Sequence, residues 1–153
     1  MKKMLGMILT LALAAGLAWP VYAESSTVPP EVTAHAYLVM DAQTGQVLVQ
    51  KGGAERNYPA SITKIMTLAL AMEKCGGDMT QQVTVSPDAV YSLEAGSSHV
   101  ALQPGEVVSL NDLFHATILA SANDAANVLA EYTAGSMEAF VELMNAKAAE
   151  LGL

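Results

Sequence analysis

The segment PASITKIMTLALAMEK, residues 59–74, gives the strongest secondary-structure signal in the chain. After Pro59 it contains no Gly or Pro, it is rich in Ile, Leu, Met and Ala, and Gly76-Gly77 follows it. A proline before such a run and glycines after it mark the start and the end of a helix, so we predict a helix over Ala60–Lys74. Apolar residues point to nearly all sides of this helix, which is typical of a helix buried in the middle of a domain.

Shorter elements are predicted on both sides of this helix. Two β-prone runs with Thr44-Gly45 between them, Ala36–Asp41 and Gln46–Gln50, predict a β-hairpin. Beyond the helix, the sequence predicts a strand at Val83–Val85, turns at Gly96–Ser98 and Pro104-Gly105, and helices at Leu110–Ala120, Asp124–Thr133 and Met137–Leu151. A hairpin alone is too small to cover a central buried helix, so we expect the chain to be incomplete as a fold.

The start of the chain reads as an export signal. Lys2 and Lys3 precede an almost purely apolar run, Met4–Trp19, and Val21–Ala23 offers small residues before a cleavage site. The alternative is an uncleaved membrane anchor, but the run is shorter than the roughly 20 residues that a membrane span needs. We therefore expect a signal peptide at residues 1–23, a linker at residues 24–34, and a folded portion at residues 35–153 that lies in the periplasm or on the outer face of the cytoplasmic membrane.

Composition and charge exclude several classes of protein. Hydrophobic residues make up 52% of the chain and charged residues 14%, whereas a disordered chain has the opposite balance. Removal of residues 1–23 takes away two lysines and no acidic residue, which leaves a net charge of -10. Because this charge repels phosphate groups, we predict no nucleic-acid binding and no attraction to anionic lipid.

The sequence offers no recognisable metal site. Cys75 is the only cysteine, which excludes a disulfide framework within the chain and a cysteine-rich zinc site. His35, His99 and His115 do not have the spacing of metal ligands. We therefore predict neither a metal nor another cofactor.

Ser61 and Lys64 form a Ser-x-x-Lys pattern in the first turn of the predicted central helix. Their spacing places both side chains on one face. A serine is a poor nucleophile unless a base takes its proton, and a lysine is that base only when uncharged, a form that burial among apolar neighbours favours. The helix N-terminus also offers backbone N–H groups to an oxyanion. The structural alternative is that Ser61 caps the helix and Lys64 extends to solvent.

A second motif, Ser121-Ala122-Asn123, lies between two predicted helices. It offers a hydroxyl group that can relay a proton and an amide that can bind an amide of a substrate. The alternative is that Ser121 or Asn123 caps the helix that begins at Asp124.

With their flanking residues, the two motifs resemble the penicillin-binding D-alanyl-D-alanine carboxypeptidases, serine peptidase family S11. The resemblance covers nearly all of Ala36–Leu153. Its main blocks are DAQTGQVL at 41–48, YPASITKIMT at 58–67, SANDAA at 121–126, FVELMN at 140–145 and Leu151-Gly152.

The resemblance implies a role for each motif residue. Ser61 would attack the carbonyl between two D-alanines and form an acyl-enzyme. Lys64 would accept the serine proton, and Ser121 would pass it toward the leaving amine. Asn123 would hold the substrate amide and the lysine in place. The substrate would be a peptidoglycan stem peptide ending in D-Ala-D-Ala, and β-lactam antibiotics would act as acylating inhibitors.

The resemblance also implies an α/β (α+β) fold of the β-lactamase and DD-peptidase-like transpeptidase type. The family's Lys-Thr-Gly motif is absent, and the only lysine after Asn123 is Lys147, within a predicted helix. We therefore expect residues 35–153 to be the N-terminal portion of the catalytic domain, without its closing strands. By itself the chain should hydrolyse little or nothing, and membrane contact should need a C-terminal region that is missing.

Two other functions stay open at this point. The first is a serine β-lactamase of the same superfamily, and the second is a non-catalytic protein that binds the cell wall or senses penicillin. The sequence Ser121-Ala122-Asn123 and the residues that follow it favour the peptidase.

Overall fold

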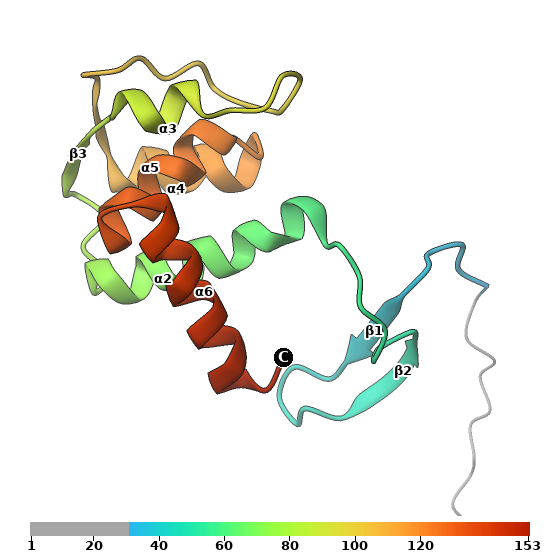
Figure 1. The fold of residues 1–153 in the computed structure, drawn as a ribbon. Coiled ribbons are helices and arrows are strands. Elements are labelled where there is room, and N and C mark those ends of the chain that lie inside the picture. Colours follow the sequence, from blue (N-terminus) through green and yellow to red (C-terminus); the bar gives the residue numbers. More distant parts are fainter. Residues whose placement is uncertain (1–30) are drawn as a thin grey trace, which may run out of the picture. The chain divides into compact units, whose positions relative to one another are not determined.

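The structure, a computed structural model, describes residues 31–153, and the chain divides into two compact units between Arg56 and Asn57 (Figure 1). The predicted export signal, residues 1–23, lies outside the described residues, as does most of the predicted linker.

The first unit contains a β-hairpin, as predicted. β1 (Tyr37–Met40) pairs antiparallel with β2 (Val47–Lys51). In the turn, the Asp41 carboxylate accepts hydrogen bonds from the backbone N–H of Thr44 at 2.7 Å and from the Thr44 hydroxyl at 2.8 Å. These bonds, the backbone one first, lower the pKa of Asp41 from its ordinary value of 3.8. Gly45 completes the turn with a φ of 73°, a left-handed conformation that glycine adopts without strain.

The second unit is mainly helical and contains one small sheet. Its elements, in chain order, are the 3₁₀ helix η1 (Ala60–Thr63), α2 (Lys64–Cys75), β3 (Gln82–Thr84), α3 (Pro87–Tyr91), β4 (Val107–Ser109), α4 (Leu110–Leu119), α5 (Asn123–Ala134) and α6 (Met137–Leu151). The sheet is formed by β3 and β4, which pair antiparallel. None of the helices between residues 31 and 153 combines the length and the apolar character that crossing a membrane requires.

Local sequence signals set the ends of the longer helices. The Ser109 hydroxyl accepts a hydrogen bond from the N–H of Asp112 at 3.1 Å and so caps α4. Ser136 caps α6 in the same way, and Gly152 ends α6 in a left-handed conformation. The predicted helices that became α4, α5 and α6 are confirmed to within one residue at each end.

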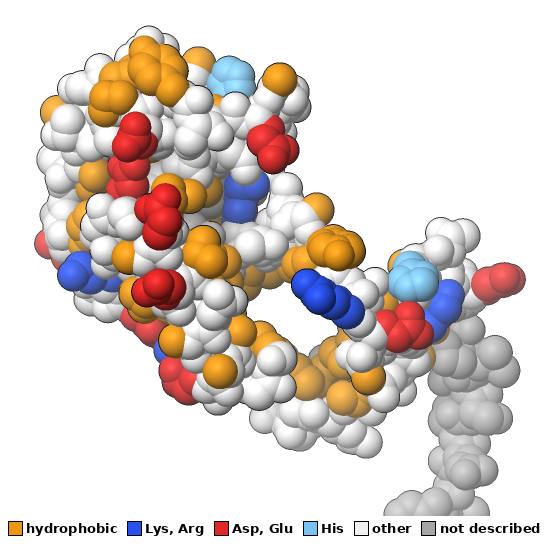
Figure 2. All heavy atoms as spheres, viewed as in Figure 1, with side chains coloured by type: hydrophobic (Ala, Val, Ile, Leu, Met, Phe, Trp, Pro, Cys, Tyr) orange, Lys and Arg blue, Asp and Glu red, His pale blue; other side chains and the backbone are white. Residues whose placement is uncertain are grey.

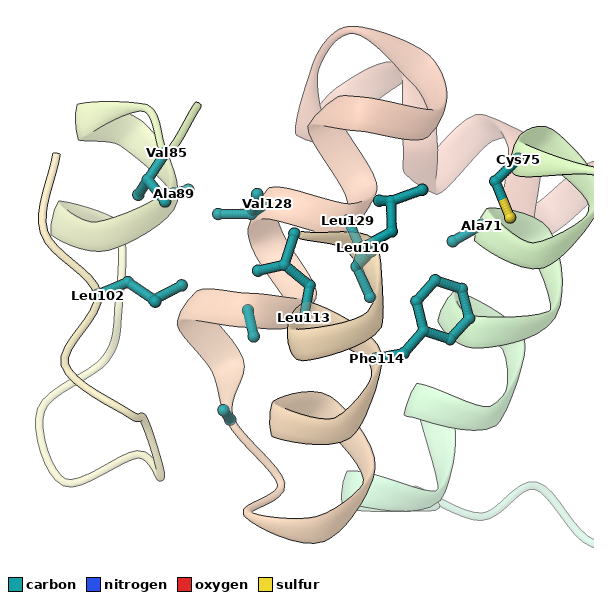
Figure 3. Close-up of a cluster of buried hydrophobic side chains, with 12 residues drawn as sticks. Ala71, Cys75, Val85, Ala89, Leu102, Leu110, Leu113, Phe114, Val128 and Leu129 are labelled. Atoms are coloured by element: carbon teal, nitrogen blue, oxygen red, sulfur yellow. The ribbon is translucent and has the colours of Figure 1, made fainter. Parts of the chain in front are cut away.

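Helix α5 is the centre of the second unit and contacts α2, α3, α4 and α6. In Figure 3, Leu110 and Leu113 of α4 lie beside Val128 and Leu129 of α5 in the core. The cluster consists of Ala71, Cys75, Val85, Ala89, Leu102, Leu110, Leu113, Phe114, Ala122, Ala125, Val128 and Leu129. Because Ala122 and Ala125 belong to it, the core fixes the N-terminus of α5 in place.

Three expectations about this unit need correction. The central segment begins as a 3₁₀ helix and becomes α-helical only at Lys64. It is not buried on all sides, since Ile62 and Ile65 are 66% and 62% exposed. The reason is that α4, α5 and α6 pack against α2 through the side that carries Leu70 and Ala71, whereas Ile62 and Ile65 lie outside these core clusters. Finally, α3 and β4 were not predicted, because segments of five and three residues are too short to show a periodic pattern.

The surface of the helical unit carries many carboxylates. Figure 2 shows acidic side chains exposed along it, with apolar side chains between them. This agrees with the net charge of -8 of the whole chain.

Candidate active site

Ser61 and Lys64 lie at the junction of η1 and α2 and line one pocket of about 320 Å³. Ser61 is exposed, whereas only 8% of Lys64 is accessible to solvent. Among the described residues, no carboxylate forms an ion pair with the Lys64 amine. The alternative in which Lys64 extends to solvent is therefore wrong, and its buried side chain lines the same pocket as the accessible Ser61.

The backbone just before Ser61 is strained. Ala60 has a φ of 48°, in the left-handed region that residues with a side chain rarely adopt. Such conformations cost about 1–3 kcal/mol and are concentrated at functional sites. The strain therefore supports a functional role for this turn.

One backbone N–H of this turn is already engaged. The N–H of Ile62 donates to the carbonyl of Pro59 at 3.1 Å, so an oxyanion at Ser61 would need another N–H group. The tight 3₁₀ geometry of η1 is the reason, because it closes hydrogen bonds earlier than an α-helix does.

Ser121 lies between α4 and α5 and faces Ser61, although 60 residues separate them in the chain. The Ser121 hydroxyl donates a hydrogen bond to the Ser61 hydroxyl, with 3.0 Å between the oxygens. Like Ala60, Ser121 has a positive φ, of 52°. The bond to Ser61 brings a second hydroxyl to the nucleophile candidate, within the distance needed for proton transfer.

Asn123 is the first residue of α5 and lines the same pocket as Ser61 and Lys64. Its backbone N–H and its side-chain Nδ2 both donate to the carbonyl of Ser98, at 2.8 Å and 3.0 Å. The helix cap position is occupied by Ala122, with no side-chain cap. The alternative in which Ser121 or Asn123 serves as a helix cap is therefore wrong.

The structure thus brings all four predicted site residues together, and it adds contacts that sequence reasoning missed. Thr63 and Thr67 also line the pocket. Ser98 was assigned only to a turn, and Asp124 only to a helix start. Nothing in the sequence near these two residues shows that the turn and the start of α5 are bonded to each other, because 25 residues separate Ser98 from Asn123.

The remaining reactive side chains have local partners. The Cys75 thiol is buried and donates to the carbonyl of Met72 at 3.4 Å. His35 lies 3.1 Å from a carboxylate oxygen of Glu55, both on the surface. Between residues 31 and 153, no three His, Cys, Asp or Glu side chains lie close enough to bind one metal ion together.

Comparison with known proteins gives a consistent result. Residues 23–153 match the peptidase S11 family, described as D-alanyl-D-alanine carboxypeptidase. Over 137 residues the chain is 42% identical to D-alanyl-D-alanine carboxypeptidase DacC of Escherichia coli, a match that covers 86% of this chain and 34% of DacC. It is also 38% identical over 120 residues to DacF of Bacillus subtilis, which covers 78% of this chain and 31% of DacF. The chain therefore spans about a third of the length of these curated relatives.

Solved structures agree with this result. Penicillin binding protein 6B of Escherichia coli has a TM-score of 0.77 at 37% identity, over 85% of this chain and 43% of that protein. Penicillin binding protein 5 of Haemophilus influenzae has a TM-score of 0.73 at 36% identity, over 82% of this chain and 37% of that protein. The predicted fold class is confirmed by these neighbours. Within residues 31–153, the strands form two separate two-stranded sheets, which is consistent with part of a domain.

Proposed function

The chain belongs to the peptidase S11 family of D-alanyl-D-alanine carboxypeptidases, and from that membership we propose that the protein removes the terminal D-alanine from peptidoglycan stem peptides. The observation that carries this proposal is the hydrogen bond of 3.0 Å from Ser121 to Ser61, in combination with the pocket that Ser61 shares with the buried side chain of Lys64. A hydroxyl and an amine that line one pocket, with a second hydroxyl bonded to the first, are suited to acyl transfer through a serine ester.

In the proposed reaction, the Ser61 oxygen attacks the carbonyl carbon of the peptide bond between the two D-alanines. The serine proton passes to Lys64, which lies in the same pocket. As the C–N bond breaks, Ser121 relays that proton from Lys64 to the leaving amine, so that free D-alanine departs and Lys64 is neutral again. Water then hydrolyses the ester, and the shortened peptide is released together with the original serine.

Asn123 is proposed to bind the substrate. Its Nδ2 is engaged by Ser98, which leaves the Oδ1 acceptor for a donor in the pocket. A peptide N–H and the Lys64 ammonium formed during the reaction are both such donors. Asn123 would therefore orient the substrate and the lysine together.

Export and partners follow from the same proposal. A substrate in the cell wall requires a protein outside the cytoplasm, and residues 1–23 have the pattern of an export signal. β-Lactam antibiotics are proposed to acylate Ser61.

Labelling with a fluorescent penicillin tests the nucleophile. The chain should form a long-lived covalent adduct that Ser61→Ala abolishes. Ser109→Ala is the matched control, because it removes a helix-capping hydroxyl outside the pocket and should keep the label. A folded chain that forms no adduct would contradict the proposal and favour a binding protein, whereas rapid cephalosporin hydrolysis without a lasting adduct would indicate a β-lactamase.

A further inference from the structure

A buried carboxylate lies immediately beside the proposed site and takes no part in the proposed reaction. Asp124 follows Asn123 in α5, and only 1% of it is exposed. Its carboxylate accepts hydrogen bonds from three backbone N–H groups: Val100 at 3.2 Å to each oxygen, Leu102 at 3.0 Å, and Ala125 at 2.9 Å. Two of these donors lie more than 20 residues earlier in the chain.

Helix capping does not account for this arrangement. Only the bond from Ala125 is local to α5, and the cap position belongs to Ala122. The bonds from Val100 and Leu102 instead hold the loop over residues 98–102 against the start of the helix. We therefore relate the function of Asp124 to the position and conformation of this loop.

The loop needs such a restraint, because part of its backbone is strained. Ala101 lies between the two donors and has a φ of 61°, in the left-handed region. An alanine keeps this conformation only where surrounding contacts impose it. The two N–H groups on either side of Ala101, both bonded to one carboxylate, supply that constraint.

The same loop also sets the direction of Asn123. Its first residue, Ser98, accepts hydrogen bonds from both the backbone N–H and the Nδ2 of Asn123. The adjacent residues Asn123 and Asp124 thus bind the two ends of one loop. A shift of one end is therefore expected to change the position of the other end.

We propose that Asp124 is a positioning residue of the site: by fixing residues 98–102, it holds the Ser98 carbonyl where it orients the amide of Asn123. This inference rests on the function proposed above. The chemistry requires a carboxylate, because three N–H donors converge on its two oxygens. An asparagine at this position would direct an NH₂ group at one of those donors and leave it unpaired in a buried place.

The test compares Asp124→Asn with Asp112→Asn in the full chain. Asp112 is a matched control, because it is also an aspartate in the first turn of a helix and accepts a hydrogen bond, yet it is exposed and belongs to α4. Three readouts are made. They are the amide hydrogen exchange of Val100 and Leu102, the NMR signal of the Asn123 side-chain NH₂, and the rate of acylation by a fluorescent penicillin.

Asp124→Asn is expected to accelerate exchange at Val100 and Leu102 by about 10- to 100-fold, because hydrogen bonds to a charged acceptor are lost. It should also shift the Asn123 NH₂ signal and slow acylation by a similar factor. Asp112→Asn should leave all three readouts near wild type. An unchanged Asn123 signal with unchanged acylation in folded Asp124→Asn would overturn the proposal and leave Asp124 a purely structural role.

The result separates this inference from the proposed function. If the wild-type chain is not acylated but Asp124→Asn still shifts the Asn123 signal, the positioning role stands and the acyl-transfer function fails. If Asp124→Asn does not fold, the proposal is tested instead by hydrogen exchange of the unmodified chain at increasing denaturant concentrations. The backbone amides of Val100, Leu102 and Asn123 should then open together, with one common dependence on denaturant, and independent opening of Asn123 would overturn the proposal.

Discussion

Replacement of Lys64 by methionine should separate the stability of this protein from its chemistry. The Lys64 side chain is 8% exposed, and no carboxylate in residues 31–153 forms an ion pair with it. The Lys64 side chain also lines the pocket, so its amine is only partly removed from water. Burial of a polar group with partial compensation costs about 0.5–2 kcal/mol. Methionine fills nearly the same space without the amine, so Lys64→Met should raise the free energy of unfolding by about 0.5–2 kcal/mol.

The same substitution should abolish the proposed reaction. Without the amine, Ser61 loses its proton acceptor, and acylation by a penicillin should fall by about 10²- to 10⁴-fold. Stability is measured by thermal unfolding followed by circular dichroism. Each 1 kcal/mol corresponds to roughly 4–8 °C in Tm for a domain of this size.

Lys74→Met is the matched control, since it is the same change in the same helix. Lys74 is exposed in the last turn of α2, where a positive charge interacts favourably with the helix dipole. Its loss should lower Tm slightly and leave acylation unchanged. A Lys64→Met chain that melts below wild type, or that is acylated at the wild-type rate, would refute the reasoning about the buried amine.

Three further predictions concern the site, the core and the hairpin. Ser121→Ala removes the hydrogen-bond partner of Ser61 and should slow acylation by about 10²-fold or more, measured by labelling over time. Leu113→Ala empties a fully buried position and should lower the free energy of unfolding by about 2.7–5 kcal/mol in urea titrations. The hydrogen bonds that lower the pKa of Asp41 stabilise the turn only while the carboxylate is ionised, so this contribution is complete above pH 3.8 and is lost as the pH falls through the lowered pKa. Faster exchange of the Thr44 amide in acid, relative to its intrinsic rate, should report that loss.

Each of these predictions has an outcome that contradicts it. If the Ser121→Ala variant is labelled as fast as wild type, the hydroxyl of Ser121 is not needed for acylation of Ser61. A loss below 1 kcal/mol in Leu113→Ala would mean that the site collapses around the cavity, and Leu119→Ala, at a side chain that is 79% exposed, gives the baseline. Asp41→Asn should show the fast Thr44 exchange already at neutral pH, and slow exchange there would contradict the role of the carboxylate.

The parts of this structure that could be predicted are those in which the signal is local. Ser109 and Gly152 mark helix ends through bonds to residues within one turn, and the helices they delimit appear where predicted. Ser61 and Lys64 share a pocket because a spacing of three residues places them on one side of a turn.

The parts that could not be predicted depend on contacts between distant residues. Whether Ile62 is covered depends on elements elsewhere in the fold, so its apolar character alone led to a wrong expectation. The hydrogen bonds from Val100 and Leu102 to Asp124 could not be predicted from the local sequence, because each of these residues looks like an ordinary loop or helix residue. Ser121 and Asn123 were placed at the site only through the family resemblance, since residues alone favoured helix caps.

The central place of α5 also has a consequence for how the protein is made. α2, α3 and α4 precede α5 in the chain, yet each of them packs against it. During synthesis, the apolar surfaces of these helices that pack against α5 therefore have no partner until the ribosome has added residues 123–134. A nascent chain halted before that point is expected to remain incompletely folded and sensitive to proteases.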